Sequence, residues 1–497
     1  MARRARAERP GRRLARGRRA RPPVALFLLL LVALAAGGLY VSTSVITHVD
    51  NVLSPGMEFS LPKHATKVLP GLDAAPPEGA PGTRRINVLV LGVDRRPHHD
   101  PAKDGPPNTD SIHLLSLDPV TKTASAVAIP RDLYVEVPDP EKKGAFTEIR
   151  INTAYKRGIE AKYPGGGPAF AKRAIEYTFQ LPIDYYVVVD WLAFADVIDA
   201  MQGVWITVPE EMHNVEAVNP RDGNAYSITI PAGTQYMDAI TALAYARYRS
   251  DEQSDFGRIK RQQEVMRSAA DEALRRGWLK SGPQLYGRFK DAVDTDLSNA
   301  KLPGVLKLVS DIGLDQVKMV SLAGQGHEAV TGVITPLGED VLVPNWELMA
   351  PILRSAIDDR ALTVEGATVS VVNATGVRGQ GDRTVAYLRR FQLPPERITA
   401  ADPPLSASAA TPTPSAAGVS ASSTGAAVSP PIADQTTVAY TGDAQQTAER
   451  IARWLGLTSS RVARLDAPAG TPAAVLVTLG KDVRLPDDAR FLQYRGR

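Results

Sequence analysis

The fold is decided by Asn87-Val-Leu-Val-Leu-Gly-Val93 and by the two largely apolar stretches that follow it, Ile112-His-Leu-Leu-Ser-Leu117 and Ala124-Ser-Ala-Val-Ala-Ile129. Each stretch has the length of a β-strand and is bounded by turn-forming residues. Between the second and third stretches, Asp118-Pro-Val-Thr-Lys-Thr123 is typical of a hairpin turn. The sequence therefore predicts three strands of one sheet, the first of them buried on both faces.

Charged side chains stand at the ends of these strands: Asp94 and Arg96 follow the first, Asp110 precedes the second, and Arg131 and Asp132 follow the third. If the middle strand pairs antiparallel with both neighbours, all of these ends meet at one sheet edge. Carboxylates bind Mg²⁺ together with phosphate oxygens, and arginine forks bind phosphate through two hydrogen bonds. The alternative is that these residues cap turns and pair with one another.

A second basic cluster lies further along the chain. Arg247 and Arg249 share a face if their segment is extended, whereas Arg258 and Arg261 share a face if residues 257–276 form the helix that their apolar spacing predicts. In that helix Arg258 would lie in the first turn, which is unfavourable for a cation unless an anion binds there. The alternative is a solvated basic face balanced by neighbouring acidic residues.

The N-terminal region predicts a membrane anchor. Residues 1–23 contain ten arginines and one glutamate, and residues 24–46 contain no charged side chain. An apolar helix of that length spans a bilayer, and the preceding arginines favour a cytoplasmic N-terminus with the rest of the chain outside. The alternative is a cleaved signal peptide. Residues 47–84, rich in Pro, Gly and Ala, then form a stalk or linker.

Charge and composition limit the classes of partner. The whole chain carries a formal charge of +4, and the ten arginines and one glutamate of residues 1–23 give +9, so the remainder carries −5. Bulk charge therefore gives no reason to expect a nucleic-acid partner for the exported part. Cysteine is absent, so that part must be stabilised by its apolar core.

Two folded units are expected beyond the stalk. Residues 85–360 form the larger α/β unit, with helical stretches at 283–312 and 345–357, and residues 365–490 form a smaller α/β unit. Residues 403–431 consist almost entirely of Ala, Ser, Pro, Thr, Gly and Val and carry no charge. That composition predicts a disordered insertion in the second unit, followed by a strand, a helix and a strand.

Other motifs give little support for different chemistry. The chain has no cysteine and no Gly-x-Ser-x-Gly elbow, so a nucleophilic mechanism is not indicated. His98-His99-Asp100 lies in a proline-rich loop, which is a poor frame for a metal site. Gly165-Gly166-Gly167 lacks the Lys-Ser or Lys-Thr of a phosphate loop and predicts a turn.

Taken in order, these motifs resemble the LytR–CpsA–Psr family of extracytoplasmic phosphotransferases. The resemblance covers the anchor and residues 86–279. It is carried by Leu89–Arg96, Thr109-Asp110-Ser111, Ile129-Pro130-Arg131-Asp132, Ile151-Asn152-Thr153-Ala154-Tyr155, Val187–Val208, Arg247 with Arg249, and Asp255–Gln263. Residues 367–381, 438–442 and 478–482 resemble the LytR-type C-terminal domain often fused to such proteins. The chain departs from the family at Asn108, where an arginine is usual, and Arg95 is the nearest substitute.

The resemblance implies an α/β fold, a mixed central sheet flanked by helices as an α/β/α sandwich with a lipid-binding pocket, together with a smaller C-terminal α/β domain. It implies that Asp94, Asp110 and Arg131 are catalytic and that Asp94 and Asp110 bind the cofactor Mg²⁺. The substrate pyrophosphate would bind to Arg96, Arg131, Arg247, Arg249, Arg258 and Arg261. Residues 169–179 and 191–201 are apolar enough to line the pocket, although ordinary core packing explains them equally well.

The implied activity is the transfer of a glycopolymer from an undecaprenyl-pyrophosphate carrier to peptidoglycan through a phosphodiester, at the outer side of the cytoplasmic membrane. The residues agree with it, because cleavage of a pyrophosphate by a sugar hydroxyl needs charge neutralisation and in-line positioning rather than a protein nucleophile. Two other functions stay open: a non-catalytic polyprenyl-pyrophosphate binder that regulates envelope assembly, and a pyrophosphate hydrolase. Every assigned residue lies between Asp94 and Arg261, so the C-terminal unit is expected to be dispensable for the chemistry.

The predicted anchor can be tested by topology. Protease added to intact spheroplasts should digest the chain beyond about Ser44, because an arginine-flanked N-terminus stays in the cytoplasm. The measurement is an immunoblot against a C-terminal tag, with lysed spheroplasts as the control for protease activity. A tag that survives in intact spheroplasts and disappears in lysed ones would contradict this topology.

Overall fold

The computed structural model describes residues 84–93, 105–248, 293–298, 301–312, 316–324, 328–401, 432–466, 472–486 and 495–496, and several positions between 261 and 272. The predicted anchor, the stalk up to residue 83, the His98-His99-Asp100 motif and the 403–431 insertion lie outside these residues. Within the part of the chain that the structure describes, no helix is long and apolar enough to cross a membrane.

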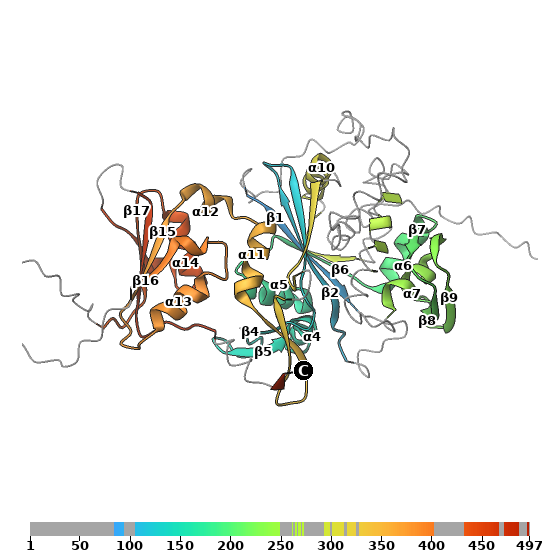
Figure 1. Cartoon of the computed structure of the whole chain (residues 1–497), viewed down its shortest axis with the longest axis horizontal. Helices are drawn as coiled ribbons and strands as arrows, with labels where there is room; N and C mark the ends of the chain where they lie inside the picture. The colour runs from blue at the N-terminus through green and yellow to red at the C-terminus, as the bar shows by residue number, and fades with distance from the viewer. Residues whose placement is uncertain are drawn as a thin grey trace, which may run out of the picture.

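A six-stranded mixed sheet forms the centre of the larger unit (Figure 1). Its strands, in spatial order, are β11 (Val293–Thr295), β6 (Tyr185–Val189), β1 (Ile86–Val93), β2 (Thr109–Asp118), β3 (Thr123–Ala128) and β12 (Val317–Ser321). β2 pairs antiparallel with both β1 and β3, while β1 with β6 and β3 with β12 are parallel pairs. The predicted arrangement of the first three strands is therefore confirmed.

Helices cover both faces of this sheet, because the side chains of β1 alternate between two apolar cores. Val88 and Val90 belong to one core, whereas Leu89, Leu91 and Val93 belong to the other. The first core is covered by α6 (Trp191–Ala200), α7 (Ala239–Arg247) and α10 (Leu302–Ile312); the second is covered by α4 (Ala154–Glu160), α5 (Gly166–Phe179) and α11 (Trp346–Ala356). The sheet between two helical layers is the α/β/α arrangement predicted from the sequence.

Apolar side chains of α5 and α6 are ordinary parts of these cores. Phe170 and Phe179 of α5 are each 1% exposed and pack in one core, and Ala193 and Ile198 of α6 pack in the other. Burial of a large apolar side chain stabilises the fold by roughly 1.5–3 kcal/mol. Core packing thus accounts for these residues, and the lipid-binding pocket stays a prediction.

Smaller β-hairpins surround the central sheet. Two of them pair β4 (Tyr134–Pro138) with β5 (Phe146–Arg150) and β8 (Met212–Val218) with β9 (Ala225–Ile230). On either side of the β8–β9 hairpin in the chain, β7 (Val204–Val208) and β10 (Gly233–Met237) form a separate two-stranded antiparallel sheet. A further hairpin joins β13 (Val330–Ile334) to β14 (Asp340–Pro344), and β13 also pairs with β20 (Arg495–Gly496). A short 3₁₀ helix, η2 (Ile151–Thr153), leads from β5 into α4.

One local prediction was wrong and another was confirmed only in part. Helix was expected throughout residues 283–312, but Val293–Thr295 is strand β11, which pairs antiparallel with β6 and forms an edge of the sheet. Gly165-Gly166-Gly167 does turn the chain, yet α5 already begins at Gly166. Gly167 is required by packing rather than by turn geometry, because a Cβ there would lie 2.6 Å from the carbonyl oxygen of Tyr155 in α4.

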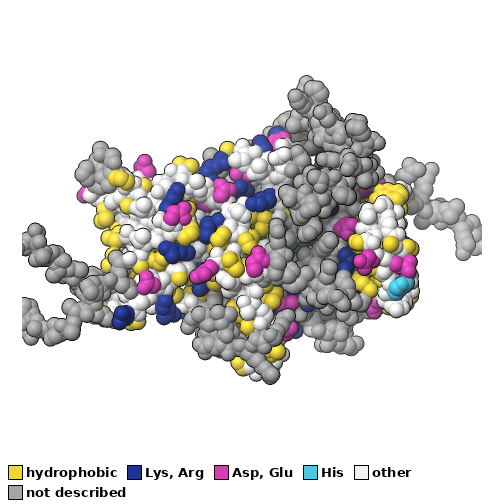
Figure 2. All heavy atoms as spheres, in the orientation of Figure 1, with side chains coloured by type: hydrophobic (Ala, Val, Ile, Leu, Met, Phe, Trp, Pro, Cys, Tyr) yellow, Lys and Arg dark blue, Asp and Glu magenta, His cyan; other side chains and the backbone are white. Residues whose placement is uncertain are grey.

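The C-terminal unit has its own sheet and its own apolar core. Its strands, in spatial order, are β16 (Ile398–Ala401), β15 (Thr368–Asn373), β19 (Ala474–Leu479), β17 (Thr437–Thr441) and β18 (Val462–Arg464). Its helices are α12 (Arg360–Glu365), α13 (Gln380–Leu388) and α14 (Gln445–Trp454), with 3₁₀ turns η5 (Pro395–Arg397) and η6 (Ser459–Arg461). The strand, helix and strand predicted after the insertion are β17, α14 and β19. Basic and acidic side chains are interspersed over the described part of the face shown in Figure 2.

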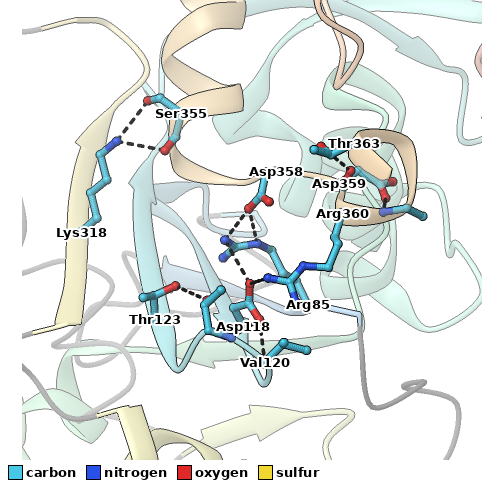
Figure 3. Close-up of polar contacts among 12 residues, drawn as sticks. Arg85, Asp118, Val120, Thr123, Lys318, Ser355, Asp358, Asp359, Arg360 and Thr363 are labelled. Atoms are coloured by element: carbon cyan, nitrogen blue, oxygen red, sulfur yellow. Dashed lines mark hydrogen bonds and ion pairs between the residues drawn. The ribbon is translucent and has the colours of Figure 1, made fainter. Parts of the chain in front are cut away.

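A buried carboxylate joins the two units at the sheet edge where β1 begins and β2 ends. The Asp118 side chain is only 3% exposed, and its Oδ2 lies 3.5 Å from Nη2 of Arg85 and 3.6 Å from Nη2 of Arg360. Arg85 Nε also donates to Oδ1 of Asp358 at 2.9 Å, in the segment between α11 and α12 (Figure 3). The larger unit thus contributes Arg85 and Asp118, and the connection to the C-terminal unit contributes Asp358 and Arg360.

Asp118 also holds the turn between β2 and β3, since its Oδ1 accepts hydrogen bonds from the backbone N–H groups of Val120 and Thr121 at 2.8 and 3.0 Å. Burial raises the pKa of Asp118. The N–H groups of Thr121 and Val120 and the charge of Arg85 lower this pKa, and together they outweigh the effect of burial. The net pKa therefore lies below the ordinary value of 3.8. The carboxylate stays charged at the pH values at which cells live.

Asp118→Asn should lower the free energy of unfolding by about 3 kcal/mol at pH 7, because it leaves two arginines beside an uncharged partner. A depressed folded-state pKa means that this contribution is complete above the unfolded value of 3.8 and is lost as the pH falls through the lower folded value. The difference between parent and variant should therefore shrink below pH 3.8. Urea denaturation at several pH values measures it.

Asp139→Asn is the matched control. Asp139 Oδ1 accepts the N–H groups of Glu141 and Lys142 in the same turn geometry, at 2.8 and 2.9 Å, but on the surface. Equal losses in the two variants would show that the turn, and not the arginine cluster, is responsible for the effect at Asp118.

Candidate functional site

The opposite edge of the sheet gathers the strand ends that the sequence singled out. Val93 at the end of β1 pairs with Thr109 at the start of β2, and just beyond β3 the N–H of Ile129 donates to the carbonyl of Ile112 at 3.0 Å. Asp110 and the Pro130-Arg131-Asp132 segment consequently lie at this same edge. Asp94 and Arg96, which follow β1 in the sequence, lie outside the described residues.

Arg131 joins two carboxylates at this edge. Its Nη1 donates to Oδ1 of Asp110 at 2.9 Å, and its Nε donates to Oδ2 of Asp132 at 3.1 Å. The side chains of Arg131, Asp110 and Asp132 are 21%, 33% and 18% exposed, so the group is held in place and still reaches solvent. The predicted meeting of Asp110 and Arg131 is confirmed. Their mutual pairing also agrees with the simpler alternative, in which these residues pair with one another.

The Ile151-Asn152 motif holds the Arg131 loop against β2. Asn152 N–H donates to the carbonyl of Arg131 at 3.0 Å, and Ile151 N–H donates to the carbonyl of Leu133 at 2.8 Å. On the other side, the Thr109 hydroxyl donates to the carbonyl of Asn152 at 3.1 Å. Two backbone hydrogen bonds therefore hold the Arg131 loop against the motif, and the Thr109 hydroxyl holds the motif against β2. These contacts give the motif a structural role that involves no substrate.

Two residues at the site were missed by sequence reasoning. Arg150 places Nη1 4.0 Å from Oδ1 of Asp132 and Nη2 3.5 Å from Oε1 of Glu339. Its Nε is buried and has no hydrogen-bond partner among the described residues. The position of Arg150 just before the Ile151-Asn152 motif was a usable signal. Glu339 gave none, because it reaches the site from the distant β13–β14 hairpin.

The charge balance of this cluster constrains what it can bind. Among the residues that the structure describes, Asp110, Asp132 and Glu339 contribute three negative charges against the two positive charges of Arg131 and Arg150, a balance of −1. A phosphate group would be repelled by that balance unless further cations took part. Those cations are either the arginines of the second cluster or a metal ion.

Mg²⁺ fits the residues at this edge. Within the described residues no group of three or more His, Cys, Asp or Glu side chains is placed to hold a metal. Mg²⁺, however, needs only one or two carboxylates, with water and substrate phosphate oxygens as the other ligands. The carboxylate of Asp110 uses Oδ1 for Arg131 and is one third exposed, and Asp94 follows β1 directly in the sequence.

The second arginine cluster is built around Tyr248. Arg261 Nη2 donates to the carbonyl of Tyr248 at 2.5 Å, and its guanidinium carbon lies 5.3 Å from the centre of the Tyr248 ring. Arg247, the last residue of α7, places Nη2 3.8 Å from Oε2 of Glu216. Arg249 and Arg258 lie outside the described residues, so their predicted roles stay predictions.

A buried tyrosine ties α7 to the segment that carries Arg261. The Tyr245 side chain is 1% exposed, and its hydroxyl donates to Oε2 of Glu264 at 2.7 Å. Burial and the nearby charge of Glu264 raise the pKa of Tyr245 far above its ordinary value, so it remains a donor. The described positions between 261 and 272 are helical, which agrees with the helix predicted there.

Ser111 and His113 of β2 form a hydrogen bond of 2.8 Å between the Ser111 hydroxyl and Nε2 of His113. Burial lowers the pKa of His113 to about 4, so the ring is neutral at physiological pH. The side chain is 4% exposed within the sheet. This pair is a partly buried contact of β2 and gives no support for a serine nucleophile.

Two family models match the chain. Residues 72–341 match the LytR_cpsA_psr family, and residues 366–482 match the family described as LytR cell envelope-related transcriptional attenuator. The second match falls on the C-terminal unit. The first covers the central sheet, both arginine clusters and the β13 strand.

Individual proteins that resemble the chain share less than a third of its residues over the matched region. Regulatory protein MsrR of Staphylococcus aureus is 28% identical over 218 residues, which cover 44% of this chain and 58% of MsrR, less than two thirds of its length. The polyisoprenyl-teichoic acid–peptidoglycan teichoic acid transferase TagU of Oceanobacillus iheyensis is 29% identical over 312 residues, 62% of this chain and 85% of TagU. The crystal structure of B. subtilis TagV is 23% identical and covers 55% of this chain and 96% of TagV, with a TM-score of 0.42. Because the first family model alone spans more than half of the sequence, the chain belongs to the LytR_cpsA_psr family.

Proposed function

We propose that this protein is an extracytoplasmic phosphotransferase that attaches a glycopolymer to peptidoglycan through a phosphodiester in cell wall assembly. The donor is the glycopolymer on an undecaprenyl-pyrophosphate carrier, and the protein is held in the cytoplasmic membrane by residues 24–46. The observation that carries the proposal is the convergence of Asp110, Arg131 and Asp132 at one sheet edge in a chain of this family. The name of TagU, a teichoic acid transferase acting on peptidoglycan, supports the same class of reaction.

The reaction needs no covalent intermediate on the protein. An acceptor hydroxyl attacks the phosphorus next to the glycopolymer, and a new P–O bond to the acceptor forms. The bridging P–O bond of the pyrophosphate breaks, polyprenyl monophosphate leaves, and the hydroxyl proton passes to a carboxylate at the site. The donor's own pyrophosphate supplies the driving force, so no nucleotide is required outside the cell.

The residues of the site divide this work. Arg131 is fixed by two carboxylates and presents a guanidinium to the phosphate that develops charge. Arg96, Arg247, Arg249, Arg258 and Arg261 would complete the binding of the pyrophosphate. Asp94 and Asp110 would hold Mg²⁺, which when bound supplies the positive charge that the described cluster lacks. Asp110 or Asp132 would accept the proton.

Arg131→Ala should weaken binding of a short polyprenyl-pyrophosphate glycan at least about tenfold, since one charge-assisted bond to phosphate is worth roughly 1.5–3 kcal/mol. The affinity of Arg131→Lys should lie between those of the parent and Arg131→Ala, because lysine keeps the charge but lacks the two-pronged guanidinium. The control is Arg378→Ala, an exposed arginine in the C-terminal unit. Binding is measured by fluorescence titration with Mg²⁺ present. If Arg131→Ala binds like the control, the cluster is only a network of surface ion pairs.

Turnover separates a transferase from the other functions. The full-length protein in detergent, with the donor, Mg²⁺ and peptidoglycan oligomers, should yield oligomers heavier by the glycan and one phosphate, measured by mass spectrometry. Chelation with EDTA should stop the reaction and added Mg²⁺ should restore it. Asp110→Asn should abolish turnover with little change in the thermal midpoint, whereas Asp139→Asn should behave like the parent.

Other products would overturn the proposal. Glycan phosphate released without attachment to the oligomer would identify a hydrolase. Donor bound tightly and recovered unchanged would identify a binder, in keeping with the regulatory name of MsrR. Full turnover by Asp110→Asn would remove this carboxylate from the mechanism.

A further inference from the structure

The β13–β14 hairpin is bonded directly to the loop that carries Arg131. Leu342 of β14 donates its N–H to the carbonyl of Asp132 at 2.9 Å, and Leu342 and Leu133 form a parallel bridge. Tyr134, Val333, Val341 and Val343 form a small apolar core between the hairpin and the start of β4, separate from the two main cores. The backbone just after Arg131 is therefore bridged to β14, an outer strand of the small β14–β13–β20 sheet.

The turn of this hairpin fixes Glu339 beside Arg150. Thr335 N–H donates to the carbonyl of Glu339 at 2.8 Å, Glu339 N–H donates to the Thr335 hydroxyl at 3.1 Å, and Gly338 N–H donates to the carbonyl of Thr335 at 2.9 Å. Gly338 has φ +79°, which favours glycine. With its backbone held in this way, Glu339 places Oε1 3.5 Å from Nη2 of Arg150, which in turn faces Asp132.

The outer edge of the hairpin is closed by residues from beyond the C-terminal unit. Val333 pairs with Gly496 and Ile334 pairs with Arg495 in an antiparallel ladder. Arg484 also returns to the larger unit: its Nη2 donates to Oε1 of Glu136 at 2.7 Å and its guanidinium lies 3.5 Å from the centre of the Phe146 ring. In Figure 1 the C-terminus lies next to the tip of this hairpin and away from the C-terminal unit.

We propose that the hairpin, closed by β20, is a positioning element for the site and that Glu339 is a positioning residue. The hairpin acts on the site through two contacts. One is the backbone hydrogen bond from Leu342 to Asp132, and the other is the series of ion pairs from Glu339 through Arg150 to Asp132. Both contacts end on Asp132, which accepts a hydrogen bond from Arg131 Nε. This inference rests on the proposed function, and its β20 part revises the expectation that the C-terminal part of the chain is dispensable for the chemistry.

Charge predicts a specific kinetic signature for Glu339→Gln. The change removes a carboxylate from a cluster whose balance is −1, so it makes the site no less attractive to an anionic donor. A loss of positioning, by contrast, lowers the rate of the bound complex. The kcat should fall about tenfold, while KM for the donor rises less than about twofold. Glu339→Asp should restore part of kcat because it restores the charge.

The matched control is Glu210→Gln, an exposed glutamate after β7. A second variant ends the chain at Leu492 and thereby removes β20. Its kcat should also fall, and the combination of this truncation with Glu339→Gln should be no slower than the slower single variant, since both act through the hairpin. Multiplication of the two effects, or a kcat for Glu339→Gln equal to that of Glu210→Gln, would overturn the inference.

Hydrogen–deuterium exchange keeps the inference testable if the parent shows no turnover, a result that would count against the proposed function alone. The Leu342 amide donates to Asp132, so its peptide should exchange faster in the truncated chain than in the full chain, with peptides of α5 unchanged as the internal reference. Equal exchange of the Leu342 peptide in both chains would show that β20 does not support the hairpin, whatever the enzyme does.

Discussion

The antiparallel pairing of β2 with both β1 and β3 is the constraint on which the candidate site depends. Reversal of direction at each step brings the end of β1, the start of β2 and the segment after β3 to one edge. Parallel neighbours would place those ends on opposite sides of the sheet. Burial fixes the register of this pairing. Side chains of β1 alternate between two separate cores, and a slip of one residue would move each of them to the other face of the sheet.

The same pairing explains which parts of the site could be predicted from the sequence. Asp110 lies on β2 and Arg131 just after β3, and a short hairpin joins these two strands, so local patterning was enough to bring the two residues together. Glu339 contacts Arg150, and Arg495 pairs with Ile334, in each case across a long stretch of sequence. Nothing in the local sequence of Glu339 or Arg495 indicates these partners. The strand at Val293–Thr295 was missed for a related reason, since three residues are too few to show a period.

Opposite charges appear at both ends of the central sheet, with different consequences. At the far edge Asp118 is almost completely buried between Arg85 and Arg360, so its ion pairs are permanent parts of the fold. At the site edge the side chains of Asp110 and Arg131 remain one fifth to one third exposed, so their ion pair is in contact with solvent. Burial rather than residue type separates a structural cluster from a candidate functional one.

The ladder between β20 and β13 has a consequence for the order in which the protein matures. If the chain is exported from its N-terminus, as proposed above, β13 emerges long before residues 495–496, and domains generally fold in the order of synthesis. During that interval the outer edge of the hairpin has unpaired backbone groups, which can accept a strand from another molecule. The edge of β13 can be closed only after residues 495–496 have crossed the membrane. Translocation of the C-terminal region would therefore be the step that ends the exposure of these backbone groups.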